Sequence, residues 1–198
     1  MKLYLLRHGD AGESSAEGYT TDAARALTPK GIKRTRQLAN ALRQMEITFD
    51  TIYSSPLIRA QQTAEIVARS LQLEKQLRTT SQLAPDHPLT DALLLIEGAA
   101  VKAKAILLVG HEPHFSQLIS LLCTGGTHLG LSLKKGGLCR LELTAVNAGP
   151  CATLERVLSP RHYGPKRKAR TEEPRAAATI VVECRLTLRR LGASATLA

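Results

Sequence analysis

The sequence is poor in the residues on which several classes of protein depend. It contains no tryptophan and only two phenylalanines, and its four cysteines form no Cys-x-x-Cys pair. The cysteine spacing therefore indicates neither a zinc site nor a dense disulfide framework. Long hydrophobic runs are also missing, because the N-terminal apolar run ends at Arg7 and is far shorter than a signal peptide or membrane span. We expect a reduced, cytoplasmic protein that does not contact membranes.

Positive charge is in excess, but most of the excess lies near the C-terminus. The chain of 198 residues has a formal net charge of +10. Residues 161–198 hold nine Lys and Arg against three Glu, a net charge of +6, which leaves +4 for residues 1–160. Residues 164–170 combine Gly, Pro and charge like a solvated linker, without aromatic residues to stack on bases. We predict a domain over residues 1–163 and a basic, poorly ordered tail over residues 164–198, to which any nucleic-acid binding is confined.

Two histidines each follow a short apolar run. Leu3–Leu6 leads into Arg7-His8-Gly9-Asp10, and Ala105–Val109 leads into Gly110-His111-Glu112-Pro113. Ligands of open α/β sheets bind at the carboxyl ends of the strands. Because both histidines are expected at such strand ends, the sequence predicts one shared site.

A third motif lies between these two. Ser54-Ser55-Pro56-Leu57-Ile58-Arg59 follows the β-like stretch Asp50–Tyr53. Pro56 suits the first turn of a helix, which places Arg59 near the same sheet edge. With the Arg-His-Gly before it and the Gly-His after it, the sequence resembles the histidine phosphatase superfamily (phosphoglycerate mutase-like) over residues 1–160.

Hydrophobic periodicity supplies the remaining elements. Thr28 and Pro29 start a helix as N-cap and first residue, and apolar positions from Ile32 to Met45 then recur on one face. Further helices are predicted over residues 57–71, 90–101 and 115–122, and further strands over residues 138–143 and 152–157. Strands that alternate with helices predict a three-layer α/β/α fold with a mostly parallel central sheet.

The residue types at the predicted site suit phosphoryl transfer. A histidine is largely neutral at pH 7, and Arg7 and Arg59 should keep His8 neutral by opposing a second positive charge. Neutral His8 can attack phosphorus and form a phosphohistidine that water then hydrolyses. Arginine forks match phosphoryl oxygens, over which charge spreads during transfer. No carboxylate cluster suited to Mg²⁺ or Zn²⁺ is present, so we expect neither a metal site nor a cofactor.

The resemblance assigns roles to these residues. It implies that His8 is the nucleophile and that Arg7, Arg59 and His111 are catalytic residues that bind the phosphoryl group. Small phosphohistidine phosphatases of this superfamily often have an arginine followed by Leu-Thr before the first helix. Arg25 occupies that place and is a further candidate phosphate ligand, although an exposed loop arginine is an equal alternative.

The missing parts indicate which members of the superfamily the chain resembles. Related mutases and sugar phosphatases insert a helical cap that usually carries a glutamate as general acid. Here only residues 85–104 separate Ser81–Pro85 from the His111 strand, which leaves no room for a large cap, and Asp86 is the nearest possible acid. An open site without a strong acid suits the labile P–N bond of a phosphohistidine protein, as in SixA-type phosphohistidine phosphatases.

Two alternatives stay open at this stage. The chain could be a small-molecule phosphomonoesterase of the same superfamily, with Asp86 as the acid. It could also be a non-catalytic module that binds phosphate or nucleic acid through the Arg/His pocket and the basic tail. Turnover distinguishes these classes, because a binding module should not form a covalent phosphohistidine.

Overall fold

A computed structural model of the protein describes residues 1–12, 21–144 and 150–163. The predicted basic tail, residues 164–198, lies outside the described residues. Within the described ranges, no helix is both long enough and apolar enough to cross a membrane.

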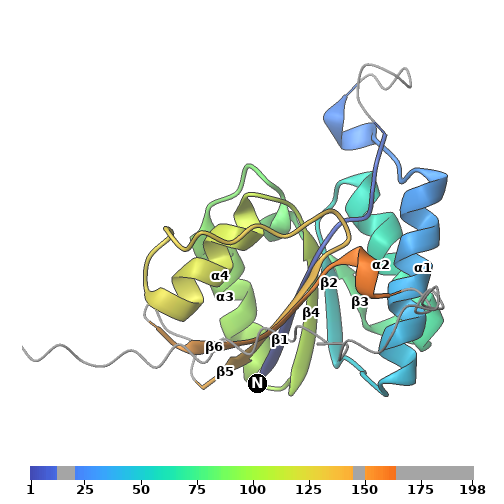
Figure 1. Ribbon diagram of the computed structural model, residues 1–198. Helices are drawn as coiled ribbons and strands as arrows, with labels where there is room; N and C mark the ends of the chain where they lie inside the picture. Colours follow the sequence, from blue (N-terminus) through green and yellow to red (C-terminus); the bar gives the residue numbers. More distant parts are fainter. Residues whose placement is uncertain (13–20, 145–149, 164–198) are drawn as a thin grey trace, which may run out of the picture.

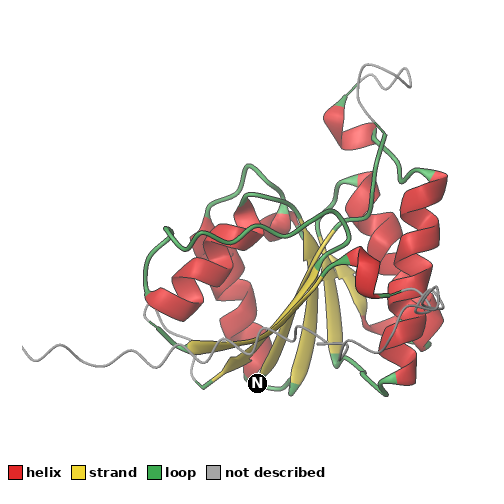
Figure 2. Ribbon diagram, viewed as in Figure 1, coloured by secondary structure: helices red, strands yellow, loops and turns green. Residues whose placement is uncertain are grey.

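One mixed sheet of six strands forms the middle layer (Figure 2). Its strand order is β3-β2-β4-β1-β5-β6. Neighbours among β1 to β4 run parallel, whereas β5 is antiparallel to both β1 and β6. The strands are β1 (Lys2–Arg7), β2 (Thr51–Ser54), β3 (Leu77–Thr79), β4 (Ala105–Gly110), β5 (Leu138–Leu143) and β6 (Ala152–Leu158). The prediction of a three-layer fold with a mostly parallel sheet is confirmed.

Helices cover both faces of this sheet (Figure 1). The two on one face are α1 (Pro29–Gln44) and α2 (Ile58–Leu71), and the two on the other are α3 (Leu89–Ala100) and α4 (His114–Thr124). Alternation along β1 explains the two cores, since Tyr4 and Leu6 pack with α1 and α2 while Leu3 and Leu5 pack with α3 and α4. All four side chains are buried, so β1 is the central strand of the hydrophobic core.

Local signals fix most helix ends where the sequence placed them. The Thr28 side chain accepts a hydrogen bond of 3.0 Å from the Gly31 N–H, and Pro29 is the first residue of α1. Gly125 ends α4 with a φ of 78°, a left-handed conformation that glycine adopts without steric cost. Pro56 does not enter the first turn of α2, because that helix begins at Ile58.

The connection between β3 and α3 adds no helical cap at the carboxyl edge of the sheet. Between β3 and α3 the described chain, which is continuous there, forms only the short 3₁₀ segment Ser81–Leu83 and no helical cap. The strand β3 itself was not predicted. It has three residues at the edge of the sheet, and two of them are exposed, so it carries no hydrophobic period.

Candidate active site

The ends of β1 and β4 bring the two predicted histidines together. Arg7 pairs with Gly110 across these parallel strands, and the His8 N–H donates to the Gly110 carbonyl at 2.9 Å. The rings of His8 and His111 are both buried, with centroids 5.1 Å apart and planes inclined by 51°. Residues that are a hundred positions apart in sequence thus form one site at the carboxyl edge of the sheet.

Hydrogen bonding defines which nitrogen of His8 can react. The Nδ1 atom lies 2.7 Å from the carbonyl oxygen of Gly9, which can only accept a hydrogen bond. The proton of the neutral ring is therefore on Nδ1, and the lone pair is on Nε2. Burial, together with the positive charges of Arg59 and Arg7, lowers the pKa of His8 to about 4. His8 is thus neutral at pH 7, and Nε2 is the ring nitrogen whose lone pair can react.

Gly9 allows the loop to pack tightly beneath His8. A β-carbon at Gly9 would lie 2.8 Å from the hydroxyl of Thr35 on α1. Its N–H donates to the Thr63 hydroxyl at 3.0 Å, and that hydroxyl donates to the Arg59 carbonyl at 2.7 Å. Hydrogen bonds from the glycine of the Arg-His-Gly motif therefore hold the loop that follows His8 against α2, the helix that carries Arg59.

Arg59 contacts both His8 and a carboxylate that the sequence analysis did not single out. Its Nε–H lies 3.3 Å from His8 Nε2, and its two terminal nitrogens donate to the backbone oxygen of Asp22 at 2.7 Å and to its carboxylate at 2.8 Å. Burial raises the pKa of the Asp22 carboxyl, but hydrogen bonds and charges from Arg59 and Arg25 outweigh it and lower the pKa. Asp22 is therefore ionised and holds the arginine fork beside His8.

Arg25 reaches the same cluster. It donates to the Gly12 carbonyl at 2.9 Å and forms a salt bridge with Asp22. The Asp22 carboxylate thus bridges Arg25 and Arg59, two of the residues that the sequence suggested for phosphate binding. A bound phosphoryl group would compete with this carboxylate for both guanidinium groups.

Arg7 extends from the end of β1 toward the loop before β5. One terminal nitrogen donates to the Leu133 carbonyl at 2.7 Å. Burial lowers the pKa of Arg7, although the nearby Glu112 carboxylate opposes this effect. Glu112 also accepts a hydrogen bond of 3.2 Å from the Leu133 N–H, so it supports Arg7 electrostatically and helps to fix the loop that Arg7 contacts.

Ser55 orients His111. The Nε2 atom of His111 lies 2.8 Å from the Ser55 hydroxyl, which also accepts a hydrogen bond of 3.4 Å from the Leu57 N–H. The hydroxyl proton remains available to donate to Nε2, and in that arrangement the ring proton of neutral His111 is on Nδ1. Burial and the neighbouring His8 and Arg59 lower the pKa of His111 to about 3, so the ring acts as a neutral donor at pH 7.

Several donors around His8 have no acceptor in the described part of the chain. These are buried nitrogen atoms, namely Arg7 Nε, Arg25 Nε and His111 Nδ1. Buried polar groups are normally paired, and a group of unpaired donors beside two histidines is a reason to expect a functional site. A tetrahedral oxyanion offers acceptors for such a set of donors.

The predicted acid Asp86 lies apart from these contacts. It is exposed before α3, and the structure records no hydrogen bond from it to His8 or His111. Its neighbour His87 pairs with Asp91 at 3.0 Å, and the Gln82 side chain donates to the Asp91 carbonyl. A role for Asp86 stays a prediction.

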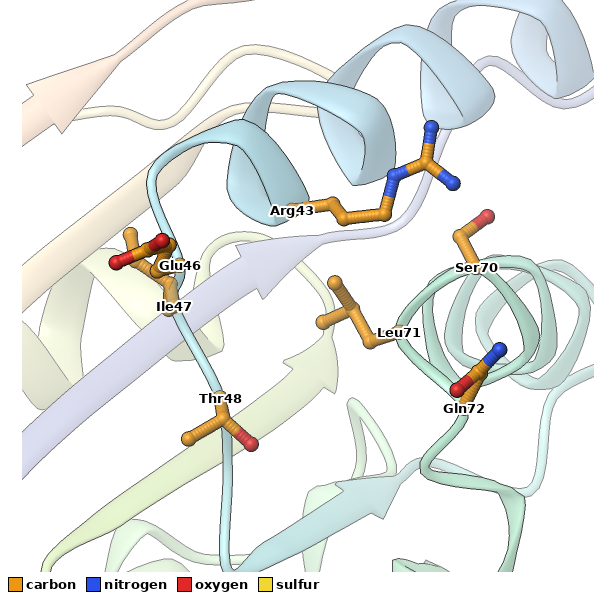
Figure 3. A pocket seen from close by; sticks show the side chains of 7 residues that line it. All are labelled: Arg43, Glu46, Ile47, Thr48, Ser70, Leu71 and Gln72. Carbon is orange, nitrogen blue, oxygen red and sulfur yellow. The ribbon is translucent and has the colours of Figure 1, made fainter.

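Two other structural features bear on ligand binding. A hollow between the C-terminal ends of α1 and α2 is lined by residues that include Arg43 and Leu71 (Figure 3), away from the histidines. Among the residues that the structure describes, no group of three or more His, Cys, Asp or Glu side chains could hold a metal ion.

Comparisons with known proteins agree with this geometry. The model of the histidine phosphatase superfamily (branch 1) matches residues 3–84. The phosphohistidine phosphatase SixA of Escherichia coli is 33% identical over 132 residues, which cover 64% of this chain and 77% of that protein. An uncharacterized protein of Picosynechococcus is 39% identical over 144 residues, covering 72% of this chain and 85% of the relative.

A solved structure supports the fold independently. The protein histidine phosphatase SixA complexed with tungstate superposes with a TM-score of 0.72 at 24% sequence identity, covering 83% of this chain and all of that chain. At this identity the likeness shows a shared fold.

Proposed function

The chain belongs to the histidine phosphatase superfamily, and from this we propose that it removes the phosphoryl group from a phosphohistidine on a protein domain. The main support for the proposal is the hydrogen bond between His8 Nδ1 and the Gly9 carbonyl oxygen, which are 2.7 Å apart. This hydrogen bond leaves the lone pair of the neutral ring on Nε2. Similarity to the phosphohistidine phosphatase SixA supports the choice of substrate.

The first chemical step is a transfer between two imidazoles. His8 Nε2 forms a bond to phosphorus while the P–N bond of the substrate breaks, and the departing imidazole takes up a proton from solvent. Arg7, Arg59 and His111 donate hydrogen bonds to the phosphoryl oxygens. Arg25 also donates to them once the Asp22 carboxylate has moved away from its guanidinium group. The arginines supply the positive charge that stabilises the negative phosphoryl oxygens in the transition state. The proposed reaction therefore uses no metal ion.

Hydrolysis of the phosphoenzyme completes the cycle. Water adds to phosphorus, the bond between phosphorus and His8 Nε2 breaks, and inorganic phosphate leaves with the water oxygen. His8 then returns to its neutral form, which burial and the nearby arginines favour at pH 7.

In the described part of the chain no carboxyl group is hydrogen-bonded to His8 or His111, which favours a phosphoramidate over a phosphate ester. An ester releases an alkoxide that needs a proton during bond cleavage, whereas an imidazole is itself basic. The carboxylate that contacts Arg59 belongs to Asp22, whose lowered pKa keeps it ionised and unable to donate a proton at pH 7. A phosphomonoesterase would have to recruit Asp86, which is exposed outside these contacts.

The test is a substrate panel under one set of conditions. A phosphohistidine-bearing phosphotransfer domain, several sugar phosphates and p-nitrophenyl phosphate are compared by kcat/KM. We expect the phosphohistidine domain to be preferred by at least about 100-fold, a difference of about 2.7 kcal/mol in transition-state stabilisation. A preference for a sugar phosphate would instead identify a small-molecule phosphatase, and absence of turnover on every substrate would favour a binding module.

A further inference from the structure

A basic groove opens next to the nucleophile loop. It has a volume of about 470 Å³. Four segments of the chain line it, and their residues are Asp10, Lys30, Arg34, Lys134, Lys135, Ser159, Pro160 and Arg161. We call this set the basic groove. Asp10 is only two positions from His8, so the groove adjoins the candidate active site.

Hydrogen bonds attach the walls of the groove to the nucleophile loop. The Asp10 carbonyl accepts from the Thr28 N–H at 2.9 Å, which fixes the start of α1 and therefore Lys30. On the opposite wall, the Gly136 N–H donates to the His8 carbonyl at 2.8 Å, and the Tyr163 hydroxyl donates to the Gly136 carbonyl at 3.1 Å. The groove is thus held in a fixed relation to His8.

The positive charge of the groove is mostly uncompensated. Its lining has five Lys or Arg side chains and one carboxylate, a net charge of +4. Lys135 pairs with Asp10 at 3.1 Å. In the parts of the chain that the structure describes, the other four cations, Lys30, Arg34, Lys134 and Arg161, form no salt bridge. Such a concentration of one sign attracts an oppositely charged partner and raises its association rate.

We propose that the basic groove binds an acidic segment of the protein substrate, next to the phosphohistidine that enters the active site. The inference rests on the proposed function and specifies the chemistry of its partner. A protein segment fits better than a nucleic acid because the groove is short and its lining has no aromatic side chain on which a base could stack. Glutamate and aspartate side chains are of a size that this volume accommodates, and each would meet an unpaired cation.

The test uses two short peptides that each carry one phosphohistidine. In one the histidine is flanked on both sides by glutamates, and in the other by glutamines. The groove variant replaces Lys30, Arg34 and Arg161 by glutamine. A matched control variant removes three exposed cations of α1 and α2 outside the groove, with the substitutions Lys33→Gln, Arg36→Gln and Arg69→Gln.

We expect the groove variant to lose about tenfold in kcat/KM for the acidic peptide at low salt, with much less loss at 0.5 M salt, where charges more than about 4 Å apart are screened. The control variant should keep its rate, and all three proteins should hydrolyse the glutamine peptide and p-nitrophenyl phosphate equally. An equal loss in both variants, or no loss in either, would overturn the proposal.

Binding separates a failure of the groove from a failure of the proposed function. If p-nitrophenyl phosphate is hydrolysed and neither phosphopeptide is, the proposed function fails, and fluorescence anisotropy of the unphosphorylated acidic peptide then decides on the groove. Weaker binding by the groove variant than by the control variant supports the groove, and equal binding overturns it. Tighter groove-dependent binding of an oligothymidylate of matched charge would also overturn it, in favour of nucleic acid.

Discussion

The Asp22 carboxylate lies 2.8 Å from a terminal nitrogen of Arg59 and so occupies part of the fork that a phosphoryl group requires. Its side chain is 58% exposed, whereas that of Arg59 is 5% exposed, so the carboxylate can leave while the guanidinium stays. The Asp22 carbonyl accepts a separate bond from Arg59 at 2.7 Å, which does not depend on the side chain. We therefore propose that substrate binding is an exchange of one anion for another on a fixed cation.

This competition predicts the effect of removing the carboxylate. Asp22→Asn should bind orthovanadate, a phosphate analogue, about threefold more tightly than the wild type. This change in binding free energy is within the range that an exposed ion pair contributes. The inhibition constant measures the effect. Glu65→Gln, which removes one exposed carboxylate from α2, should not change it. Weaker vanadate binding by Asp22→Asn would show that Asp22 supports the clamp instead of competing for it.

The lowered histidine pKa values predict how activity depends on pH. Since the pKa of His8 is about 4 and that of His111 about 3, kcat/KM should show no loss from histidine protonation near pH 6.5. Lys135 is one of the charges that lower the pKa of His8, so Lys135→Gln should raise that pKa. Histidine resonances followed by NMR report both values directly. Titration of His8 near 6.5 in the folded protein would contradict the assignment.

The free energy of unfolding should also depend on the protonation of His8 and His111. Both folded pKa values lie below the unfolded value of about 6.5, so the unfolded chain binds more protons as the pH falls. The stabilisation is complete above pH 6.5 and is lost as the pH falls through about 4. Urea unfolding at pH 7, 5.5 and 4 measures this loss. His8→Gln should flatten the profile, and an unchanged slope would show that other groups dominate it.

Ser55 is predicted to act through the tautomer of His111. Ser55→Ala removes the hydroxyl that directs the ring proton of His111 to Nδ1, so kcat should fall about tenfold while the KM stays within about twofold. Ser55→Thr, which keeps the hydroxyl, should retain more activity. Ser54→Ala is the matched control, because Ser54 is equally buried and its hydroxyl contacts the backbone of Ser55. An equal loss in Ser54→Ala would reduce the role of Ser55 to packing.

The domain boundary gives a further prediction. We propose that residues 1–163 form the phosphatase domain, since they form a six-stranded sheet with helices on both of its faces. Truncation after Gly164 should leave the turnover of p-nitrophenyl phosphate nearly unchanged. It removes positive charge, so kcat/KM for an acidic phosphoprotein should fall in a salt-sensitive way. Unfolding of the truncated chain, or an equal loss on both substrates, would place the boundary further along.

Local patterns predicted the parts of the structure that depend on neighbouring residues. The apolar run Leu3–Leu6, the Thr28-Pro29 start and the glycine after α4 each predict an element by hydrophobic, steric and hydrogen-bonding rules that act over a few positions. The meeting of His8 with His111 also followed, because parallel strand ends share one sheet edge.

The missed features depend on contacts between distant segments. Asp22 lies in a polar stretch without periodicity, and only its distance to Arg59, 37 positions later, gives it significance. In the sequence nothing distinguishes the side chain of Ser55 from that of Ser54. Only the fold shows that the Ser55 hydroxyl lies 2.8 Å from His111 Nε2. The basic groove combines cations from three separate segments, whereas the sequence drew attention to the charge of the tail.

We propose that His8 carries the phosphoryl group during turnover, and a single-turnover experiment detects this intermediate. A phosphotransfer domain labelled with ³²P on histidine is mixed with excess protein, quenched in base within milliseconds, and digested for mass spectrometry. We predict an acid-labile, base-stable phosphate on the peptide that contains His8, absent from a folded His8→Ala variant and present in His128→Ala, which replaces an exposed histidine. Release of phosphate by His8→Ala at the wild-type rate, or labelling of another residue in the wild type, would contradict the account.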